Sequence, residues 1–292
     1  MKKYVIITDS CSDLDKETRD KYNINYIPMR LLYEDKDIPA SLDWELISYE
    51  EFYKLMREGV RFKTSQVNAH EYLAEFEKYI NEGYDILSIS ISSALSSSYK
   101  GSLVARDELK EKYPEAEIIC IDSRNSCCGL GSLCITAAKL RDEGKSIKET
   151  ADYIEANKQR MNQFCTVESL TYFKRAGRVS ATSAVFGGLL QIKPIIISDV
   201  KGQNSAIEKV KGRKNSFDRI IQMYAEVYEK DPYQRIVITH ADCVEDANTL
   251  KKALSEKIPG EEIEICKMGP IIGATAGPGT VAIFGYGKEV TQ

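Results

Sequence analysis

The sequence has little histidine and no long hydrophobic run. Two histidines, His70 and His240, occur in 292 residues, so neither a zinc centre nor a catalytic set built on several histidines is expected. No stretch approaches the ~18–20 uninterrupted apolar residues that a membrane-spanning helix requires. The basic N-terminus reaches Asp9 after an apolar run too short for a signal peptide. These absences together predict a cytoplasmic protein.

An excess of positive charge is also absent. The chain has 40 Lys and Arg against 44 Asp and Glu, a net charge of -4, so no nucleic-acid partner is expected. Its 8 cysteines include no Cys-x-x-Cys pair and are interpreted as small buried hydrophobic residues. A P-loop, a dinucleotide fingerprint, a GxSxG elbow and an HExxH helix are all missing. We therefore expect no cofactor and no bound metal.

What is present is an alternation of short apolar runs with longer amphipathic segments, the pattern of stacked βαβ units. A chain of this length favours two α/β domains, and we place their boundary near residue 160. The main expected helices follow capping residues such as Ser48, Asn68 and Ser146. The expected strands are Tyr4–Thr8, Ile24–Leu32, Asp85–Ile91, Glu117–Asp122, Phe164–Val167, Lys193–Ser198, Ala206–Val210, Arg235–Thr239, Ile263–Lys267 and Val281–Tyr286.

Four polar clusters follow expected strands or occupy turns, where open α/β sheets place ligand-binding residues. They span residues 8–13, 62–66, 92–98 and the glycine-rich loop 269–280. The first cluster either supplies an acid to a phosphate-transfer site or simply caps the following helix. The third cluster contains more serines than one helix cap needs, and their hydroxyls could donate hydrogen bonds to an anion. A glycine-rich loop lets the backbone approach a ligand closely.

Two basic segments occur in this acidic chain, at residues 174–178 and 209–214. They either form a docking surface for a negatively charged partner or are ordinary solvated charge. His240 directly follows an expected strand, where a catalytic base could lie, but a lone histidine there is interpreted as structural.

The order and spacing of these clusters resemble the DegV family of bacterial fatty-acid-binding proteins. The most specific stretch runs from Glu168 to Ser180 and continues through residues 188–195. Thr8-Asp9-Ser10, Thr64-Ser65-Gln66, Ser92–Ser98, Asp122-Ser123 and the glycine-rich loop complete the series. The resemblance covers essentially the whole chain. It implies a two-domain α/β fold with an N-terminal Rossmann-like αβα sandwich, residues 1–160, and a second α/β domain, residues 161–292.

The resemblance further implies a non-catalytic protein that holds a long-chain fatty acid between its domains. Such a protein presents the carboxylate to a separate ATP-dependent fatty acid kinase, which makes the acyl phosphate, and a peripheral or transient membrane contact is allowed. The implied ligand-binding residues are Thr64, Ser65, Ser92, Ser93, Ser96, Gly273, Thr275 and Arg178. The implied partner-binding residues are Lys174, Arg175, Lys211 and Arg213.

One residue departs from the family pattern. Thr275 stands where family members commonly carry histidine in a Gly-x-His-x-Gly-Pro-Gly loop. Threonine can donate a hydrogen bond but cannot become a cation or move a proton. Lipid binding does not need a residue at this position that can become a cation or move a proton. Cooperation with a kinase depends more on such a residue.

Lipid binding requires mainly a long apolar tunnel. At ~0.8 kcal/mol per methylene, the ~14 methylenes of a C16 chain offer roughly 11 kcal/mol before the costs of association. The expected walls are Ile27, Met29, Leu31, residues 184–190, Ile192, Ile271 and Ile272. Two alternatives remain open: a phosphotransferase or hydrolase that uses Asp9 with the serine cluster, and a binding module for another small anion or polar lipid.

Overall fold

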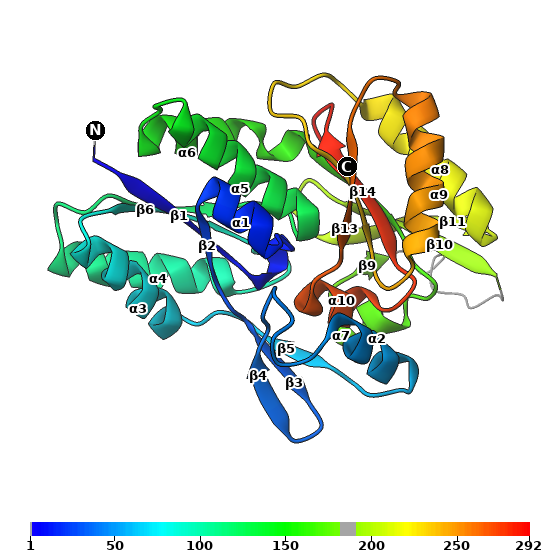
Figure 1. The fold of residues 1–292 in the computed structure, drawn as a ribbon, viewed down its shortest axis with the longest axis horizontal. Helices are drawn as coiled ribbons and strands as arrows, with labels where there is room; N and C mark the ends of the chain where they lie inside the picture. The colour runs from blue at the N-terminus through cyan, green and yellow to red at the C-terminus, as the bar shows by residue number, and fades with distance from the viewer. Residues whose placement is uncertain (1, 182–190) are drawn as a thin grey trace.

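The computed structural model describes residues 2–181 and 191–292 and has two large sheets with helices on their faces (Figure 1). The first sheet is parallel, with the strand order β2-β1-β6-β7. Its strands are β1 (Tyr4–Asp9), β2 (Ile24–Ile27), β6 (Asp85–Ser90) and β7 (Ile118–Asp122). Strands β1 and β6 are buried along their whole length, as expected of a parallel sheet covered on both faces.

Helices cover both faces of this sheet. On one face lie α3 (Ala69–Asn81) and α4 (Ser98–Lys112), and on the other lie α1 (Lys16–Tyr22), α5 (Cys127–Asp142) and α6 (Ile147–Asn157). Asn68 and Ser146 cap α3 and α6 as expected, and each does so in a capping box. A capping box was expected at Ser48, whose side chain accepts from the backbone N–H of Glu51 at the start of α2 (Tyr49–Arg57). The expected N-terminal αβα sandwich is confirmed.

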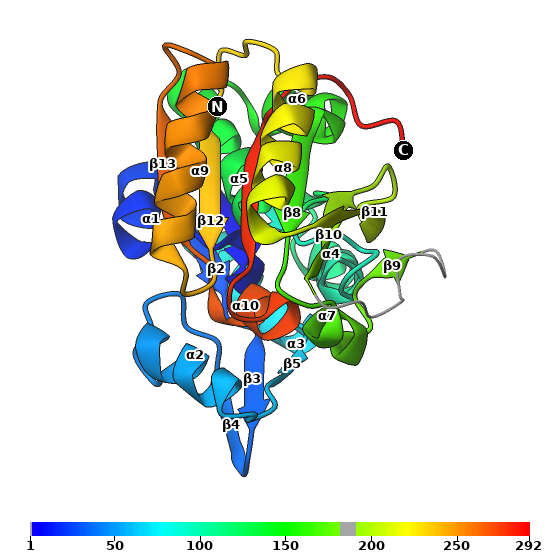
Figure 2. The ribbon, with the colours of Figure 1, turned by 90° about the vertical axis from the view of Figure 1, so that its right-hand side faces the viewer.

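The second sheet is mixed and has the strand order β13-β12-β14-β8-β10-β11-β9. Helices α8 (Arg213–Val227) and α9 (Val244–Lys257) cover one of its faces (Figure 2). A short helical turn, η2 (Lys158–Arg160), leads into its first strand. The strands are β8 (Met161–Thr166), β9 (Ser180–Ala181), β10 (Ile192–Ser198), β11 (Asn204–Lys211), β12 (Ile236–His240), β13 (Ile263–Lys267) and β14 (Val281–Tyr286).

Helix α5 connects the two sheets, because it contacts β1 of the first and β8 and β14 of the second. Every residue from Cys127 to Ala138 is buried and none of them is charged, as expected of a helix segment without a solvent face. A Cβ atom on Gly131 would lie 2.5 Å from the carbonyl oxygen of Ser12, in the short turn η1 (Ser10–Ser12). Glycine is therefore required where α5 meets this turn. A domain boundary near residue 160 stays a prediction, since one core spans both sheets.

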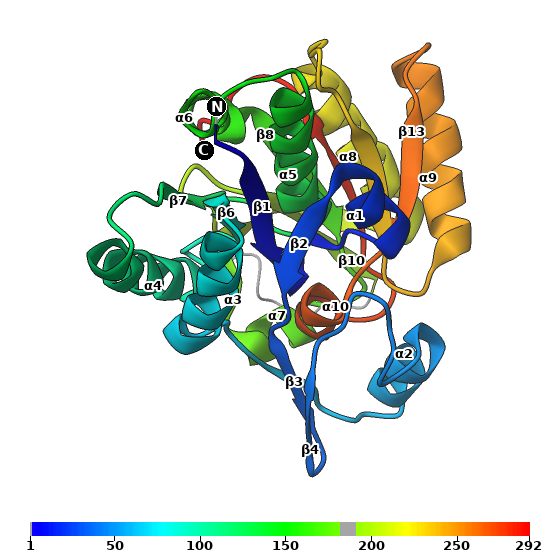
Figure 3. The same cartoon turned by 60° about the vertical axis from the view of Figure 1, so that its left-hand side comes forward.

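A small third sheet projects from the molecule beside helix α2 (Tyr49–Arg57) (Figure 3). The single strand expected over residues 24–32 is wrong, because the chain leaves the first sheet at Pro28 and re-forms as part of this one. Proline lacks the N–H that a central strand must donate. The strands of the third sheet are β3 (Arg30–Tyr33), β4 (Lys36–Pro39) and β5 (Lys63–Ser65).

The glycine-rich segment contains a helix where a loop was expected. Helix α10 (Pro270–Ala276) begins with proline at its first position, where a missing N–H has no cost. It packs against α7 (Thr171–Ala176), a second short helix that the sequence pattern did not predict. Helix α10 also contacts β5.

Candidate functional site

A cavity of about 510 Å³ opens between the two large sheets, within the size range of small-molecule sites. The first sheet and its loops supply Met29 and Ile91, the second sheet supplies Cys165, Ala282 and Phe284, and α10 supplies Ile271. Lining residues thus come from segments far apart in the sequence.

The expected apolar walls are placed only in part along this cavity. Met29, Ile271 and Ile272 line it. Ile27 and Leu31 belong instead to the buried core, and Ile192 lies on β10 without lining the cavity. The expected wall at residues 184–190 lies outside the described residues.

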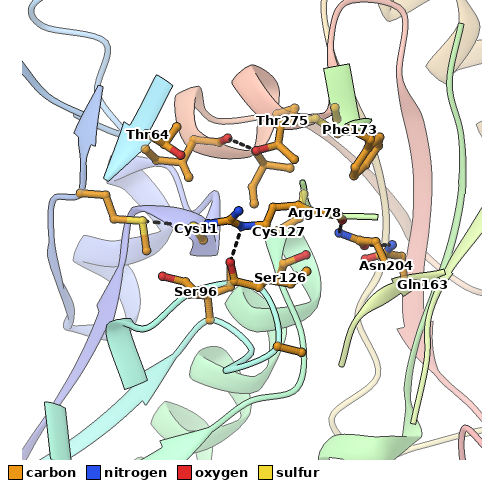
Figure 4. Close-up of a pocket in the computed structure, with 18 of the residues that line it drawn as sticks. Cys11, Thr64, Ser96, Ser126, Cys127, Gln163, Phe173, Arg178, Asn204 and Thr275 are labelled. Carbon is orange, nitrogen blue, oxygen red and sulfur yellow. Dashed lines mark hydrogen bonds between the residues drawn. The ribbon is translucent and has the colours of Figure 1, made fainter. Parts of the chain in front are cut away.

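Most of the predicted head-group residues meet at the polar mouth of this cavity (Figure 4). They come from β5, the loop before α4, α10 and the segment after α7. The predicted residues that line the cavity are Thr64, Ser65, Ser93, Ser96, Thr275 and Arg178.

The side chain of Arg178 extends between Thr275 and Ser96 in Figure 4. Its Nε donates a hydrogen bond to the carbonyl oxygen of Leu95 over 2.7 Å, and one terminal nitrogen donates to the carbonyl oxygen of Ala176 over 2.8 Å. These two bonds use two of the five N–H groups of a guanidinium. The fixed cation therefore keeps donors for an anion at the mouth, a stronger group than the neutral hydroxyls emphasised from the sequence.

The hydroxyl groups at the mouth differ in whether they already form hydrogen bonds within the protein. The Thr275 hydroxyl donates to the carbonyl oxygen of Ile271 over 3.2 Å, within its own helix. The Oγ atoms of Ser96 and Ser98 lie 2.9 Å apart and share a hydrogen bond. The exposed Thr64 hydroxyl makes no hydrogen bond to any described residue, so it is the hydroxyl most available to a ligand.

Three predicted ligand contacts have other roles. Ser93 lines the cavity, but both its hydroxyl and its backbone N–H donate to the carboxylate of Asp122. Ser92 is buried, accepts from the backbone N–H of Ala94 over 3.3 Å and does not line the cavity. Gly273 does not line it either, and lies where a Cβ atom would be 2.4 Å from the hydroxyl oxygen of Tyr53. Glycine at this position allows α10 to pack closely against Tyr53.

The acidic cluster at the end of β1 is structural. Asp9 is fully buried and accepts hydrogen bonds from the backbone N–H groups of Cys11 and Ile91, both over 2.9 Å. Burial raises the pKa of Asp9 to about 6, and it raises the pKa of Asp13, which accepts from the Cys127 thiol, to about 7. Neither carboxyl lines the cavity. Among the described residues that line the cavity, the phosphotransferase interpretation therefore has no acid.

The predicted partner-binding residues differ in their exposure to solvent. Arg213 is mostly buried, forms ion pairs with Glu168 and Asp246, and donates to the carbonyl oxygen of Gly279. Its charge is thus already paired within the protein, and its role in partner binding stays a prediction. Lys174, Arg175 and Lys211 are exposed.

His240 does not line the cavity. The backbone N–H of Cys243 donates to its Nδ1 over 3.3 Å, which leaves that nitrogen unprotonated. The Tyr49 hydroxyl oxygen lies 3.4 Å from the same nitrogen. Burial lowers the pKa of His240. These contacts agree with a structural histidine.

Two buried amides in the cavity wall were missed by the sequence analysis. The Nε2 of Gln163 on β8 donates to the Oδ1 of Asn204 on β11 over 3.0 Å, and both residues line the cavity. A polar residue within an expected strand gives no sign of which cavity it faces until the register is known.

Within residues 2–181 and 191–292 there is no group of three or more side chains suited to a metal ion. Over the same described ranges, no helix combines the length and apolar character needed to cross a membrane.

Comparison with known proteins identifies the family. A family model described as an uncharacterised protein of the DegV family matches residues 3–288. The chain belongs to the DegV family. A DegV domain-containing protein of Clostridium perfringens is 41% identical over 287 residues, which cover 98% of each chain. One from Clostridium acetobutylicum is 32% identical and covers 97% of this chain and 98% of its own.

Solved DegV structures share this fold. A DegV lipid-binding protein of Thermotoga maritima superimposes with a TM-score of 0.85 at 25% identity, covering 99% of this chain and 100% of its own. DegV of Bacillus subtilis, described as a fatty-acid-binding protein, gives a TM-score of 0.84 at 26% identity with the same coverage. The two-domain DegV-like arrangement of sheets and helices expected from the sequence is the one these proteins have.

Proposed function

We propose that this DegV protein binds one long-chain fatty acid in the cavity between its sheets. The observation that carries the proposal is the fixed guanidinium of Arg178 at the mouth of a cavity whose mixed lining includes the apolar side chains of Ile91 and Phe284. The carboxylate lies against Arg178 and the Thr64 hydroxyl, and the acyl chain runs inward past Ile91 and Ala282. The fatty-acid-binding Bacillus subtilis relative supports this ligand class.

The energetics favour this division of roles. Each buried methylene contributes ~0.8 kcal/mol, so the acyl chain supplies most of the affinity. A hydrogen bond to a charged group adds only ~1.5–3 kcal/mol. The arginine and the hydroxyl therefore orient the carboxylate at the mouth, and the walls hold the chain.

The protein has no catalytic role of its own in this proposal and presents the carboxylate to a separate ATP-dependent fatty acid kinase. Two features support presentation: Thr64 is exposed at the mouth, and the exposed cations Lys174 and Lys211 could meet an acidic partner. Such charge complementarity speeds association more than it strengthens it.

The lipid proposal is tested by extracting the purified protein with organic solvent and identifying the extract by mass spectrometry. We expect one long-chain fatty acid per chain, and weaker palmitate binding in the delipidated Arg178→Gln variant than in wild type. Arg106→Gln is the matched control, because Arg106 pairs with Asp107 on the surface of α4. A nucleotide in place of the lipid, or equal palmitate affinity in both variants, would contradict the proposal.

The presentation proposal needs a separate assay. The chain is incubated with ATP and palmitate, with and without a bacterial fatty acid kinase subunit. Acyl phosphate should form only when both proteins are present. Turnover by this chain alone would support the phosphotransferase alternative instead.

A further inference from the structure

Three uncharged polar side chains, away from the hydroxyls of the mouth, interrupt the wall of the cavity between the two large sheets. Ser126, Gln163 and Asn204 all line this cavity (Figure 4), and each is only 6% exposed. They come from the residue before α5, from β8 and from β11. A buried polar atom is costly unless it has a hydrogen-bond partner. The bonds that these side chains make and lack therefore bear on which ligand the cavity holds.

The hydrogen bonds of the two amides fix which atom of Gln163 is left over. The carbonyl oxygen of Arg178 can only accept, so Asn204 must turn its Nδ2 toward that oxygen, over 3.2 Å. The Oδ1 of Asn204 then accepts from the Nε2 of Gln163 over 3.0 Å. The Oε1 of Gln163 makes no hydrogen bond to any described residue. This oxygen is an unpaired acceptor.

Gln163 lies on the face of β8 that the acyl chain would follow. Alternate residues of a strand share a face, so Gln163 lies on the same face as Cys165, and Phe164 packs in the core beneath α8 on the other face. Cys165 pairs with Ala282 on β14, and Gln163 pairs with Phe284. All four of these paired residues line the cavity. The amide therefore lies one strand pair beyond Ala282.

Ser126 supplies a second unpaired group. It precedes α5, where a serine hydroxyl ordinarily accepts from a backbone N–H of the first turn. The Ser126 hydroxyl makes no such bond and none to any other described residue. The first turn of α5 lies against the part of β14 that pairs with Gln163, since a Cβ atom on Gly129 would be 3.1 Å from the ring of Phe284.

An unsubstituted acyl chain would bury both groups without partners, because methylenes neither donate nor accept hydrogen bonds. A ketone oxygen would suit the Ser126 hydroxyl, but it cannot donate to the Oε1 of Gln163. An alcohol both donates and accepts. It is therefore the simplest group that satisfies both residues.

We propose that the cavity binds a long-chain fatty acid that carries a hydroxyl group on its chain. This hydroxyl donates to the Oε1 of Gln163 and exchanges a hydrogen bond with the Ser126 hydroxyl. The inference rests on the proposed lipid site and narrows its ligand class.

The test compares palmitate with hydroxypalmitates that carry the hydroxyl on the second, third, tenth or last carbon. Binding to delipidated protein is measured by calorimetry. We expect at least one isomer to bind wild type at least about tenfold more tightly than palmitate, the effect of satisfying the two buried groups. The position of the hydroxyl in that isomer measures how far Gln163 lies along the chain from the carboxylate.

Ser126→Ala should bind the preferred isomer at least about tenfold more weakly than wild type and palmitate at least as tightly, because no hydroxyl is then left under the methylenes. Ser88→Ala is the matched control. The Ser88 hydroxyl is also buried without a partner among the described residues, but it does not line the cavity. Gln163→Met keeps the length of the side chain, removes Oε1 from a different element, and should also reduce the preference for the hydroxylated isomer.

The outcomes separate this inference from the proposed function. If neither palmitate nor any hydroxypalmitate binds wild type, the lipid site itself is absent and both proposals fail. If palmitate binds and no isomer binds more tightly, the hydroxyl subsite alone is overturned. A preference that persists in both Ser126→Ala and Gln163→Met would also overturn it. Weaker palmitate binding in Ser126→Ala would do the same, because that hydroxyl would then contact the carboxylate.

Discussion

At the scale of single residues, the mouth of the main cavity depends on which polar atoms are already occupied. Arg178 uses part of its guanidinium to hold the Leu95 carbonyl oxygen and keeps the rest for an anion. Ser93 is fully committed to Asp122. Thr64 has no partner among the described residues. These side chains therefore differ in how well they can contact a ligand, although all three line the same cavity.

Thr64→Val tests this difference. The substitution keeps the shape of the side chain and removes the hydroxyl, so palmitate should bind about tenfold more weakly, the effect of one hydrogen bond to a charged group. Ser93→Ala is the matched comparison and should leave palmitate affinity within about twofold, because its hydroxyl already donates to Asp122. Both affinities are read from titration of delipidated protein. A larger loss from Ser93→Ala than from Thr64→Val would reverse the assignment.

The buried carboxyl of Asp13 should make the stability of the protein depend on pH. Its pKa of about 7 in the folded protein lies above the ~3.9 of an unfolded chain. Between about pH 4 and 7 the folded state therefore keeps a proton that the unfolded state has released. The free energy of unfolding should fall as pH rises through this window, by at most ~1.4 kcal/mol per pH unit for one group. Asp9, with a pKa of about 6, acts in the same direction.

Asp13→Asn removes one of these two groups. Asn suits the left-handed backbone at this position, where φ is 50°. Urea unfolding at pH 5 and pH 8 should show a smaller loss of stability in the variant than in wild type. An identical loss in both would mean that Asp13 is ionised in the folded protein throughout this range.

At the scale of elements, the sequence predicted those whose signals are local. Asn68 and Ser146 cap α3 and α6 as expected. The segment around Pro28 was misassigned, because the run of apolar residues continues across the proline while the chain changes sheets. Helix α10 was taken for a loop, because its glycine content reflects close tertiary packing at Gly273, which no local pattern reveals.

That packing gives an element-scale prediction. In Gly273→Ala the new methyl group meets the hydroxyl of the buried Tyr53, which donates to the Met268 carbonyl oxygen. Forcing a methyl group into such a site costs typically ~1–3 kcal/mol. It should also displace Thr275 on the same helix and weaken palmitate binding. Chemical unfolding and palmitate titration measure the two effects.

Tyr53→Phe removes the obstructing hydroxyl and provides the test of cause. In the Gly273→Ala/Tyr53→Phe double variant, the loss of stability should be smaller than the sum of the two single losses. Strict additivity would show that the methyl group is destabilising for a reason other than this contact.

At the scale of the whole molecule, the cavity exists because two sheets share one buried helix. A single core includes Ile6 of the first sheet, Leu130 of α5 and Phe284 of the second sheet. The family resemblance predicted a lipid site between two domains. It could not identify the amides Gln163 and Asn204 or the wall residue Ala282, because strand register across the second sheet is set by pairing between distant segments.

The position of Ala282 allows the cavity to be shortened from within. Ala282 on β14 pairs with Cys165 on β8, and both line the cavity. In Ala282→Phe the aromatic ring enters space that the acyl chain would otherwise occupy. Palmitate should bind at least about tenfold more weakly, since each excluded methylene costs ~0.8 kcal/mol.

A shorter ligand separates chain length from head-group binding. Decanoate should lose less affinity in Ala282→Phe than palmitate does, because fewer of its methylenes reach the new ring. Ala282→Ser is the control that changes the residue without filling the cavity, and thermal unfolding checks that the variants stay folded. Equal losses for the two fatty acids would mean that the ring disturbs the mouth. Unchanged palmitate binding in folded Ala282→Phe would mean that the acyl chain does not pass Ala282 between the sheets, although Ala282 and Arg178 line the same cavity.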